Sequence, residues 1–243
     1  MLDDLFLDCF GTHSDNGQRL GRSILDRYGY TVQHATTWCY GEGDIPVLLV
    51  AHTDTVFPHP PTQILYARKQ GIISGTYGIG ADDRAGVWAI ARLLREGYRP
   101  HVLFTDLEEC GAHGATDASY DLRKPDVHCI IQIDRRGSDD AVYYGCGNLT
   151  FQQYVTDHGF TTAQGSFSDI SILAPAWNIA AVNVSAGYYH EHTEHECLHL
   201  NQLDATIDRV DAMLRDPPDH VHKYERRKRR NWQAWDDTDW RYR

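Results

Sequence analysis

Four short, largely apolar runs along the chain each end in polar residues. Runs of this length and composition are typical of strands that are covered on both faces of a sheet. The runs are Val47–Ala51, Val102–Phe104, Cys129–Ile133 and Ile179–Val184. His, Asp or Glu residues follow closely after each of them. We therefore predict four buried strands whose carboxyl ends carry ionisable side chains.

The segments between these runs have apolar residues at helical spacing. The pattern predicts an opening helix that ends near Gly29 and a second helix over Ala85–Leu94. It also predicts a final helix over Leu203–Leu214, with Asn201 as its N-cap. Strands that alternate with helices predict an α/β fold, here a three-layer αβα sandwich with a mostly parallel central sheet. Ligands of such sheets bind beyond the carboxyl ends of the strands.

The length and composition favour one domain followed by a short tail. The chain has 243 residues, of which 42% are hydrophobic, and this is enough for one substantial core. We expect the domain to span residues 1–221. Residues 222–243 contain eight Lys and Arg, four Asp and Glu, and three tryptophans. A charged, Trp-containing C-terminal tail of this kind is more typical of a solvated or partner-docking segment than of a nucleic-acid-binding arm.

Charge and cysteine content narrow the class of protein. The formal net charge is -11 at pH 7, and the acidic residues are scattered, so nucleic acid is not an expected partner. The first residues lack the basic segment and apolar run of a signal peptide, and no stretch reaches the roughly 18 to 20 apolar residues of a membrane span. Six cysteines occur without a CxxC pair, as in reduced cytosolic proteins. We expect a cytoplasmic protein with no membrane partner.

The polar residues at the predicted strand ends are of the types that bind divalent metal ions. His52 and Asp54 follow the first run, and a nearby carboxylate commonly orients a ligating imidazole. Glu108–Glu109 follow the second run, where two adjacent like charges are costly unless a cation balances them. One of these two carboxylates could bind the ion while the other takes a proton from metal-bound water. Asp134 follows the third run and supplies a further carboxylate.

Another carboxylate pair, Asp82 and Asp83, lies in the glycine-flanked segment Gly80–Gly86 before the second predicted helix. Taken alone, helix capping explains this pair as well as metal binding does. Asp134 also has a plain alternative role as a helix or turn cap. The functional alternative for the pair is a carboxylate that bridges two metal ions roughly 3.5 to 4 Å apart.

Five motifs in a fixed order resemble the co-catalytic zinc exopeptidases. This superfamily includes single-domain zinc aminopeptidases, tripeptide aminopeptidases and carboxypeptidase G-type enzymes. The motifs are Ala51–Val56, Gly80–Gly86, Glu108–Glu109, Asp134 and Gly187–Thr193. The resemblance extends from about residue 10 to about residue 214, and the layout is closest to the single-domain aminopeptidases. It implies a metal-dependent hydrolase that cleaves a peptide bond, with N-terminal cleavage favoured, or a related amide bond.

The resemblance implies a two-metal site with five protein ligands. Asp82 would bridge two divalent ions, expected to be zinc, with cobalt or manganese as alternatives. His52 and Asp134 would complete the protein ligands of one ion. Glu109 and His192 would complete those of the other.

The resemblance also implies two catalytic roles and one backbone feature. Glu108 would be the general base and acid toward a metal-bridging hydroxide that attacks the substrate carbonyl. Asp54 would orient the imidazole of His52. A cis peptide bond is expected between Asp82 and Asp83, a strained feature that functional sites tolerate.

The chain departs from some members of the superfamily in its size. Carboxypeptidase-like and tripeptidase members carry a lid or dimerisation domain after the residue that matches Asp134. Only 57 residues separate Asp134 from His192 here. Another branch inserts a domain between the residues that match His52 and Asp82, and that interval is short as well. We therefore expect a single catalytic domain without an inserted lid. The last ligand has an alternative in His190, but His192 with Glu196 four residues later fits the superfamily pattern better.

Other functions stay open on the sequence alone. His195–His199 is formally an HExxH motif, the signature of a one-zinc protease, but that motif needs a helix and the final helix is predicted to start only after it. The same two-metal site could serve an N-acyl-amino-acid amidase or a carboxypeptidase, and an inactive relative could bind a peptide or a partner. The expected partners are a peptide or small amide substrate and, as a further option, other copies of the chain.

Overall fold

The structure is a computed structural model that describes residues 3–13, 16–145 and 148–226. Residues from 227 onward, which make up most of the predicted C-terminal tail, lie outside the described residues. The predicted tail begins at His222, and this residue lies against the domain. Its backbone N–H donates to the carbonyl of His128, and its carbonyl accepts from the N–H of Ala180. A domain boundary at residue 222 stays a prediction.

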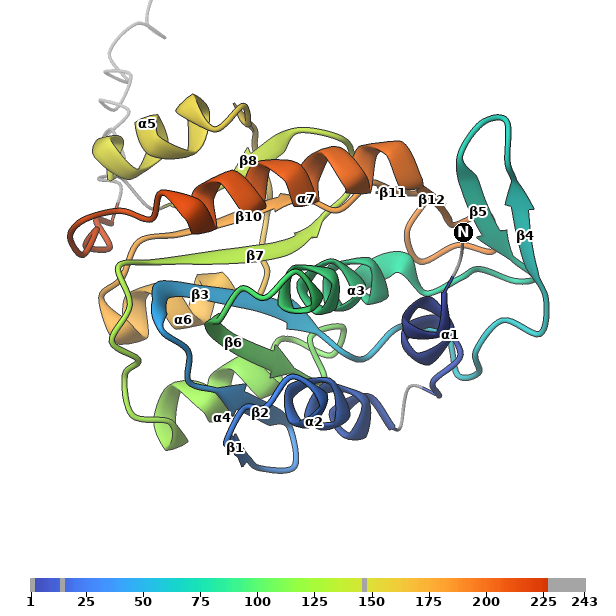
Figure 1. Cartoon of the computed structure of the whole chain (residues 1–243), viewed down its shortest axis with the longest axis horizontal. Helices are drawn as coiled ribbons and strands as arrows, with labels where there is room; N and C mark the ends of the chain where they lie inside the picture. The colour runs from blue at the N-terminus through green and yellow to red at the C-terminus, as the bar shows by residue number, and fades with distance from the viewer. Residues whose placement is uncertain (1–2, 14–15, 146–147, 227–243) are drawn as a thin grey trace, which may run out of the picture.

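An eight-stranded sheet forms the centre of the molecule (Figure 1). Its strands are β1 (Val32–His34), β2 (Trp38–Gly41), β3 (Ile45–His52), β6 (Pro100–Thr105), β7 (Cys129–Arg135), β8 (Asp140–Val142), β9 (Thr161–Thr162) and β10 (Ala181–Ser185). The strand order is β1-β2-β6-β3-β7-β10-β8-β9. The four neighbouring strands β6, β3, β7 and β10 run parallel. These are the four predicted strands, and the mostly parallel sheet is confirmed.

Helices cover both faces of this sheet. They are α1 (Asp4–Phe10), α2 (Gly17–Arg27), α3 (Ala81–Arg95), α4 (His113–Asp121), α5 (Leu149–Asp157), α6 (Ile170–Trp177) and α7 (Leu200–Arg215). Alternate residues of β3 point to opposite faces: Leu49 packs in one apolar cluster with α1, α2, α3 and α7, whereas Leu48 packs in the other with α4 and α6. The three-layer arrangement predicted from the sequence is confirmed.

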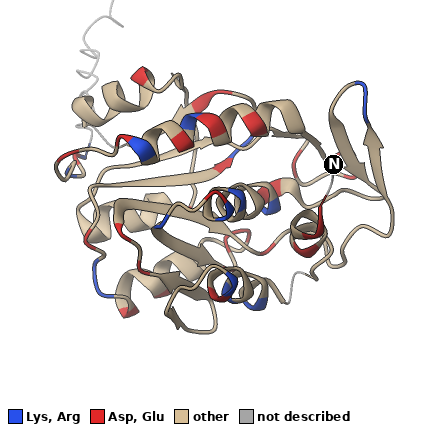
Figure 2. Ribbon diagram, viewed as in Figure 1, with Lys and Arg blue, Asp and Glu red and all other residues tan. Residues whose placement is uncertain are grey.

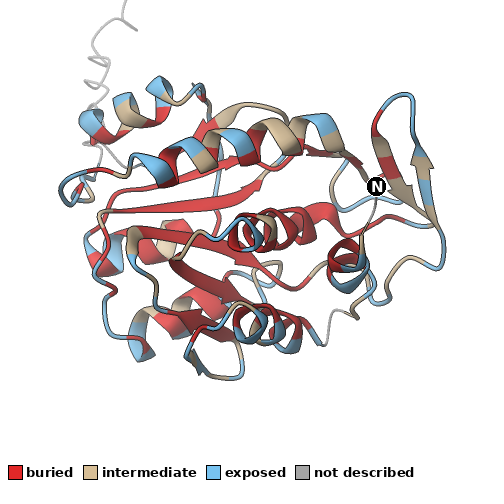
Figure 3. Cartoon of the chain, viewed as in Figure 1, coloured by how far each residue is buried: buried red, intermediate tan, exposed pale blue. Residues whose placement is uncertain are grey.

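Burial and charge follow the same layers. The central strands are buried along their length (Figure 3), as continuous apolar runs between two helical layers require. Charged residues lie mostly on the helices and in the loops, and α7 carries both acidic and basic residues (Figure 2). The acidic residues that enter the buried interior therefore need a separate explanation.

A second sheet, absent from the sequence prediction, lies at one end of the molecule. It contains β4 (Ile64–Ala67), β5 (Ile72–Gly75), β11 (Tyr188–Tyr189) and β12 (Cys197–His199), in the order β11-β12-β5-β4. The β4–β5 hairpin projects from the body (Figure 1). Within the described residues, this hairpin is the only strand pair between β3 and α3, in agreement with the predicted single domain without an inserted lid.

The final helix begins earlier than predicted. The prediction of Asn201 as the N-cap is wrong, because α7 starts at Leu200 and its N-cap is His199. The reason lies in the small sheet: β12 pairs with β5 up to His199, and the N–H of Leu200 donates to the carbonyl of Gly71. The chain therefore passes from strand to helix without a side-chain cap.

No helix in the described part of the chain is both long enough and apolar enough to span a membrane. The cysteines of the described ranges, Cys9, Cys39, Cys110, Cys129 and Cys197, are all free thiols.

Candidate metal centre

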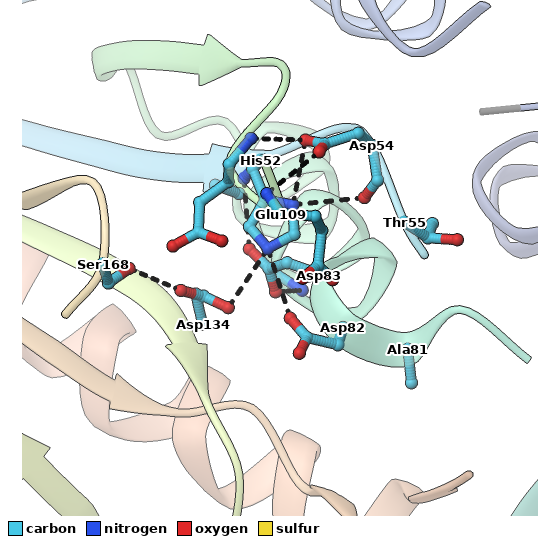
Figure 4. Close-up of polar contacts among 12 residues, drawn as sticks. His52, Asp54, Thr55, Ala81, Asp82, Asp83, Glu109, Asp134 and Ser168 are labelled. Carbon is cyan, nitrogen blue, oxygen red and sulfur yellow. Dashed lines mark hydrogen bonds and ion pairs between the residues drawn. The ribbon is translucent and has the colours of Figure 1, made fainter. Parts of the chain in front are cut away.

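His52, the last residue of β3, lies between carboxylates on both sides of its ring (Figure 4). Its Nδ1 is 3.2 Å from Asp54 Oδ1. Its Nε2 is 3.2 Å from Asp82 Oδ1 and 3.5 Å from Asp134 Oδ1. The imidazole is buried, with 1% of the side chain exposed. One ring nitrogen is thus fixed by Asp54, and the other faces the two carboxylates that were predicted as its fellow ligands.

Asp54 also holds the turn that carries the two glutamates. Its Oδ1 accepts the N–H of Glu108 and its Oδ2 accepts the N–H of Glu109, each at 3.2 Å. β6 ends at Thr105, so both glutamates lie in a turn beyond the strand. A single carboxylate therefore orients the His52 ring and the turn bearing Glu108 and Glu109.

Asp82 lies at the start of α3 and faces two histidines with its two carboxylate oxygens. Oδ1 is 3.2 Å from His52 Nε2, and Oδ2 is 3.1 Å from His192 Nε2. The peptide bond between Asp82 and Asp83 is cis, as the sequence resemblance predicted. With one carboxylate oxygen toward His52 and the other toward His192, Asp82 lies between the two histidines.

Asp83, the neighbour of Asp82, is engaged by backbone groups. Its side chain accepts the N–H of His52 at 3.3 Å and the N–H of Gly86 at 2.9 Å. Gly86 allows a close approach of α3 to β7, because a Cβ at this position would lie 2.0 Å from the carbonyl oxygen of Ile133. Asp83 and Gly86 thus fix the start of α3 against the ends of β3 and β7.

Asp134, near the end of β7, is surrounded by hydrogen-bond donors that the sequence did not reveal. Its Oδ2 accepts from Gln132 Nε2 at 3.0 Å, Ser168 Oγ at 2.7 Å and Asn183 Nδ2 at 3.2 Å. Its Oδ1 faces His52. Three donors on one oxygen fix the rotation of the carboxylate. Gln132 and Asn183 interrupt apolar strand runs, and this is the sequence signal that could have indicated them.

His192 and Glu109 form the second group around Asp82. His192 Nε2 is 2.9 Å from Glu109 Oε2 and 3.1 Å from Asp82 Oδ2. His192 has 48% of its side chain exposed and a positive φ of 62°. The other oxygen of Glu109, Oε1, is buried without a hydrogen-bond partner. The structure therefore brings His192 into the cluster, while its role as a ligand stays a prediction.

Two groups of side chains in this cluster have the spacing of metal ligands. In each group the nitrogen and oxygen atoms lie within 4.8 Å of one another. The groups are His52, Asp82 and Asp134, and Asp82, Glu109 and His192. Imidazole nitrogen and carboxylate oxygen are a donor set for zinc and related divalent ions. A cation would also satisfy the buried Oε1 of Glu109, so the residues fit such an ion.

The electrostatics of the cluster indicate an excess of buried negative charge. Burial raises the pKa of Glu108 to about 9 and that of Glu109 to about 7, and neighbouring aspartates add to both shifts. Burial would raise the pKa of Asp82 too, but hydrogen bonds from His192 and His52 hold it below its usual range. A bound cation favours the ionised form of a nearby carboxylate. Divalent ions would therefore allow the carboxylates of Asp82, Glu108 and Glu109 to be ionised at the same time.

The cluster opens into a pocket of about 200 Å³. Its lining combines the cluster with residues near the ends of β7, β8 and β11 and with residues between β9 and α6. They are Asp82, Glu108, Glu109, Asp134, Arg135, Arg136, Tyr144, Ser166, Phe167, Tyr188, Glu191 and His192. A hollow of about 680 Å³ shares Arg136, Glu191 and His192 with this pocket. A substrate that reaches the cluster could therefore extend along the surface past these three residues.

The HExxH reading of His195–His199 does not fit the local structure. Residues Cys197–His199 form strand β12, so the two histidines do not lie on adjacent turns of a helix, as a one-zinc site requires. The glutamate of the motif, Glu196, is buried and accepts backbone N–H groups from residues at the start of α3 and just before it.

Comparison with known proteins gives matches in structure alone. No model of a known protein family and no curated protein matches the sequence. A tripeptidase from Staphylococcus aureus superposes with a TM-score of 0.69 at 16% identity, over 87% of this chain and 96% of that chain. A TET aminopeptidase from a marine sediment archaeon of the Thaumarchaeota superposes with a TM-score of 0.71 at 12% identity, over 87% of this chain and 96% of that chain.

A third solved structure, the TET1 peptidase of Pyrococcus horikoshii, gives a TM-score of 0.60 at 15% identity, over 86% of this chain and 98% of that chain. It is described as able to assemble into a tetrahedron or a large octahedral shell. At these identities the likeness shows a shared fold. The chain thus has the fold of solved aminopeptidases and tripeptidases, which the sequence resemblance predicted.

Proposed function

We propose that this protein is a metal-dependent peptidase that removes residues from the N-terminus of small peptides. The observation that carries the proposal is the position of Asp82, whose two carboxylate oxygens face two separate groups of metal-ligand type. The shared fold of solved aminopeptidases supports it. A single-metal site would not need such a shared carboxylate.

The ligand assignment follows the two groups. His52 and Asp134 would hold one divalent ion together with Asp82, and Glu109 and His192 would hold the other together with Asp82. Zinc is the proposed native ion, with cobalt and manganese as alternatives. When bound, the ions would polarise the substrate carbonyl and lower the pKa of a water molecule toward neutrality.

The protein's own residues would then orient the ligands and move the proton. Asp54 fixes the ring of His52 and the turn of the two glutamates. Glu108 lines the pocket and is outside both ligand groups. Its carboxylate would accept the proton of the attacking water and return it to the leaving amine.

The pocket lining favours a substrate with a free amino group. Glu191 is the one lining carboxylate that the proposal uses neither as a ligand nor as the base. It forms an ion pair with Arg136 at 2.8 Å and retains 24% side-chain exposure. Glu191 would receive the ammonium group of the peptide. Arg136 favours the alternative of a substrate carboxylate, as in a carboxypeptidase.

The proposal is tested with the full chain, zinc or cobalt, and a tripeptide in four forms: free, N-acetylated, C-amidated and doubly blocked. We expect two metal ions per chain by mass spectrometry and hydrolysis of the free and C-amidated forms only. Cleavage restricted to forms with a free carboxylate would instead establish a carboxypeptidase. Release of acetate from the N-acetylated form would point to an acylase, and absence of metal binding would refute the metallopeptidase.

Assembly into a homo-oligomer is a further part of the proposal. Its support is the assembly described for the TET1 peptidase, which has the same fold. Light scattering should give a mass larger than one chain, at a whole-number multiple of 27.7 kDa. A monomer at micromolar concentration would refute this part alone.

A further inference from the structure

Glu196 is a buried carboxylate that belongs to neither proposed ligand group. It lies four residues after His192, just before β12, and its relative exposure is 0%. Its two oxygens accept backbone N–H groups from four consecutive residues. Oε2 accepts from Ile79 at 3.2 Å, from Gly80, and from Ala81 at 3.0 Å, and Oε1 accepts from Asp82 at 3.2 Å.

These N–H groups belong to the start of α3, where the helix itself offers no acceptor. The first N–H groups of any helix lack a partner within the helix. The N-cap of α3 is Gly80, which has no side chain and a positive φ of 68°. Glu196 therefore supplies from a distant loop the acceptor that a Ser or Asp usually supplies locally. Its negative charge is also favourable at the positive end of the helix.

The same residue is linked to the loop that carries His192. The N–H of Glu196 donates to the carbonyl of Thr193 at 3.1 Å, and the N–H of Thr193 donates to the carbonyl of His190 at 3.3 Å. Glu196 thus connects the backbone at Asp82 with the turn around His192. The side chains of Asp82 and His192 face each other, with Asp82 Oδ2 3.1 Å from His192 Nε2.

We propose that Glu196 is a positioning residue that fixes the backbone of Asp82 relative to the His192 loop, so that both metal ions of the proposed function can bind together. The proposal rests on that function, because it assigns metal binding to Asp82 and His192. An uncharged amide of the same size could not replace Glu196. Its NH₂ group would point at one of the N–H donors, and the contact at Asp82 or at the helix start would be lost.

The test is a titration of the metal-free full chain with Zn²⁺ and with Co²⁺ alone. The variants are Glu196→Gln, Glu196→Asp and the matched control Glu194→Gln, whose side chain lies in the same loop and is 64% exposed. We expect Glu196→Gln to bind metal about 10- to 100-fold more weakly, as is typical for residues that orient ligands. The Co²⁺ absorption spectrum should change, because the coordination around Asp82 is altered. Glu194→Gln should match the wild type.

If Glu196 only stabilised the start of α3, the Glu196→Gln variant would behave differently. It would lower the melting temperature of the metal-free protein and leave metal affinity and the Co²⁺ spectrum of the folded variant unchanged, and this result would overturn the proposal. If Glu196→Gln does not fold, Glu196→Asp decides, because it keeps the charge but withdraws the carboxylate by one methylene. Wild-type affinity and spectrum in Glu196→Asp would then refute the inference.

Failure of the inference is distinguishable from failure of the proposed function. A wild-type chain that binds two ions, together with Glu196 variants that bind them equally well, refutes the positioning role alone. A wild-type chain that binds no divalent ion refutes both.

Discussion

At the scale of single residues, the candidate site shows how one carboxylate can differ from its neighbour. Asp82 faces His52 and His192, whereas Asp83 accepts backbone N–H groups. In the same way Glu109 contacts His192, whereas Glu108 lines the pocket outside both groups. The local backbone decides which member of each pair turns toward the cluster.

The role of Glu108 can be tested by substitution with glutamine. Glu108→Gln removes the proton acceptor but keeps the size of the side chain, so turnover should fall by about 10²- to 10⁴-fold. Metal content, measured by mass spectrometry, should remain at the wild-type value because Glu108 is outside both ligand groups. Near-normal turnover in this variant would remove Glu108 from the mechanism.

Asp54 is expected to act through other residues. Asp54→Asn would weaken the interaction with His52 Nδ1 and the bonds from Glu108 and Glu109. Metal affinity should decrease by about 10- to 100-fold, as measured by calorimetric titration with Zn²⁺. Asp44→Asn, at an exposed position away from the cluster, is the control. Equal affinities in the two variants would contradict the orienting role.

At the scale of elements, the strands that could be predicted are those whose sequence is largely apolar. β3, β6, β7 and β10 lie between two helical layers, so almost every residue is buried and the apolar run itself indicates the strand. β4 has alternating intermediate and exposed residues. Its sheet also depends on pairing of β5 with β12, more than 100 residues away, and no local pattern encodes such pairing.

The same limit applies to the site. The sequence resemblance named the side chains of the cluster, because short motifs preserve residue identity and order. It did not reveal the donors on Asp134 or the contacts of Glu196, because these depend on which loops meet in space. Asn201 was misplaced for a similar reason: the start of α7 is set by the end of β12 and not by a capping side chain.

The close packing of α3 on β7 gives a prediction for Gly86. In Gly86→Ala, the new Cβ would overlap the carbonyl oxygen of Ile133 and the carboxylate of Asp83. We expect a loss of at least about 1–3 kcal/mol in the free energy of unfolding, as for other overpacked sites. Urea denaturation would measure it. Unchanged stability would show that α3 can shift without cost and would contradict the argument from close packing.

At the scale of the whole molecule, stability should depend on metal. Each ion that binds only the folded chain would stabilise it by about 4 kcal/mol at 1,000 times its dissociation constant. For a chain of this size that corresponds to a rise in melting temperature of about 8–16 °C. Differential scanning calorimetry with zinc and with a chelator would measure the change. No difference between the two conditions would contradict the two-metal site.

The metal-free protein should become less stable as pH rises. The pKa of Glu108 is raised from 4.5 to about 9 and that of Glu109 from 4.5 to about 7. The folded state therefore binds these protons more tightly than the unfolded state. This stabilisation is full below pH 4.5 and is lost as pH rises through about 7 and then about 9. Urea denaturation of the chelated protein across this range would show the decline, and Glu108→Gln should reduce it. A flat profile would contradict the raised pKa values.

The shared carboxylate of Asp82 has a consequence for how the proposed site would fill. The first ion to arrive would take one of its oxygens and reduce its negative charge, and the second ion would then meet both a weaker ligand and a nearby positive charge. Loading should therefore be stepwise, with a half-loaded form over a range of free metal concentrations. In a medium poor in divalent ions, the fraction of active molecules would follow the weaker of the two affinities.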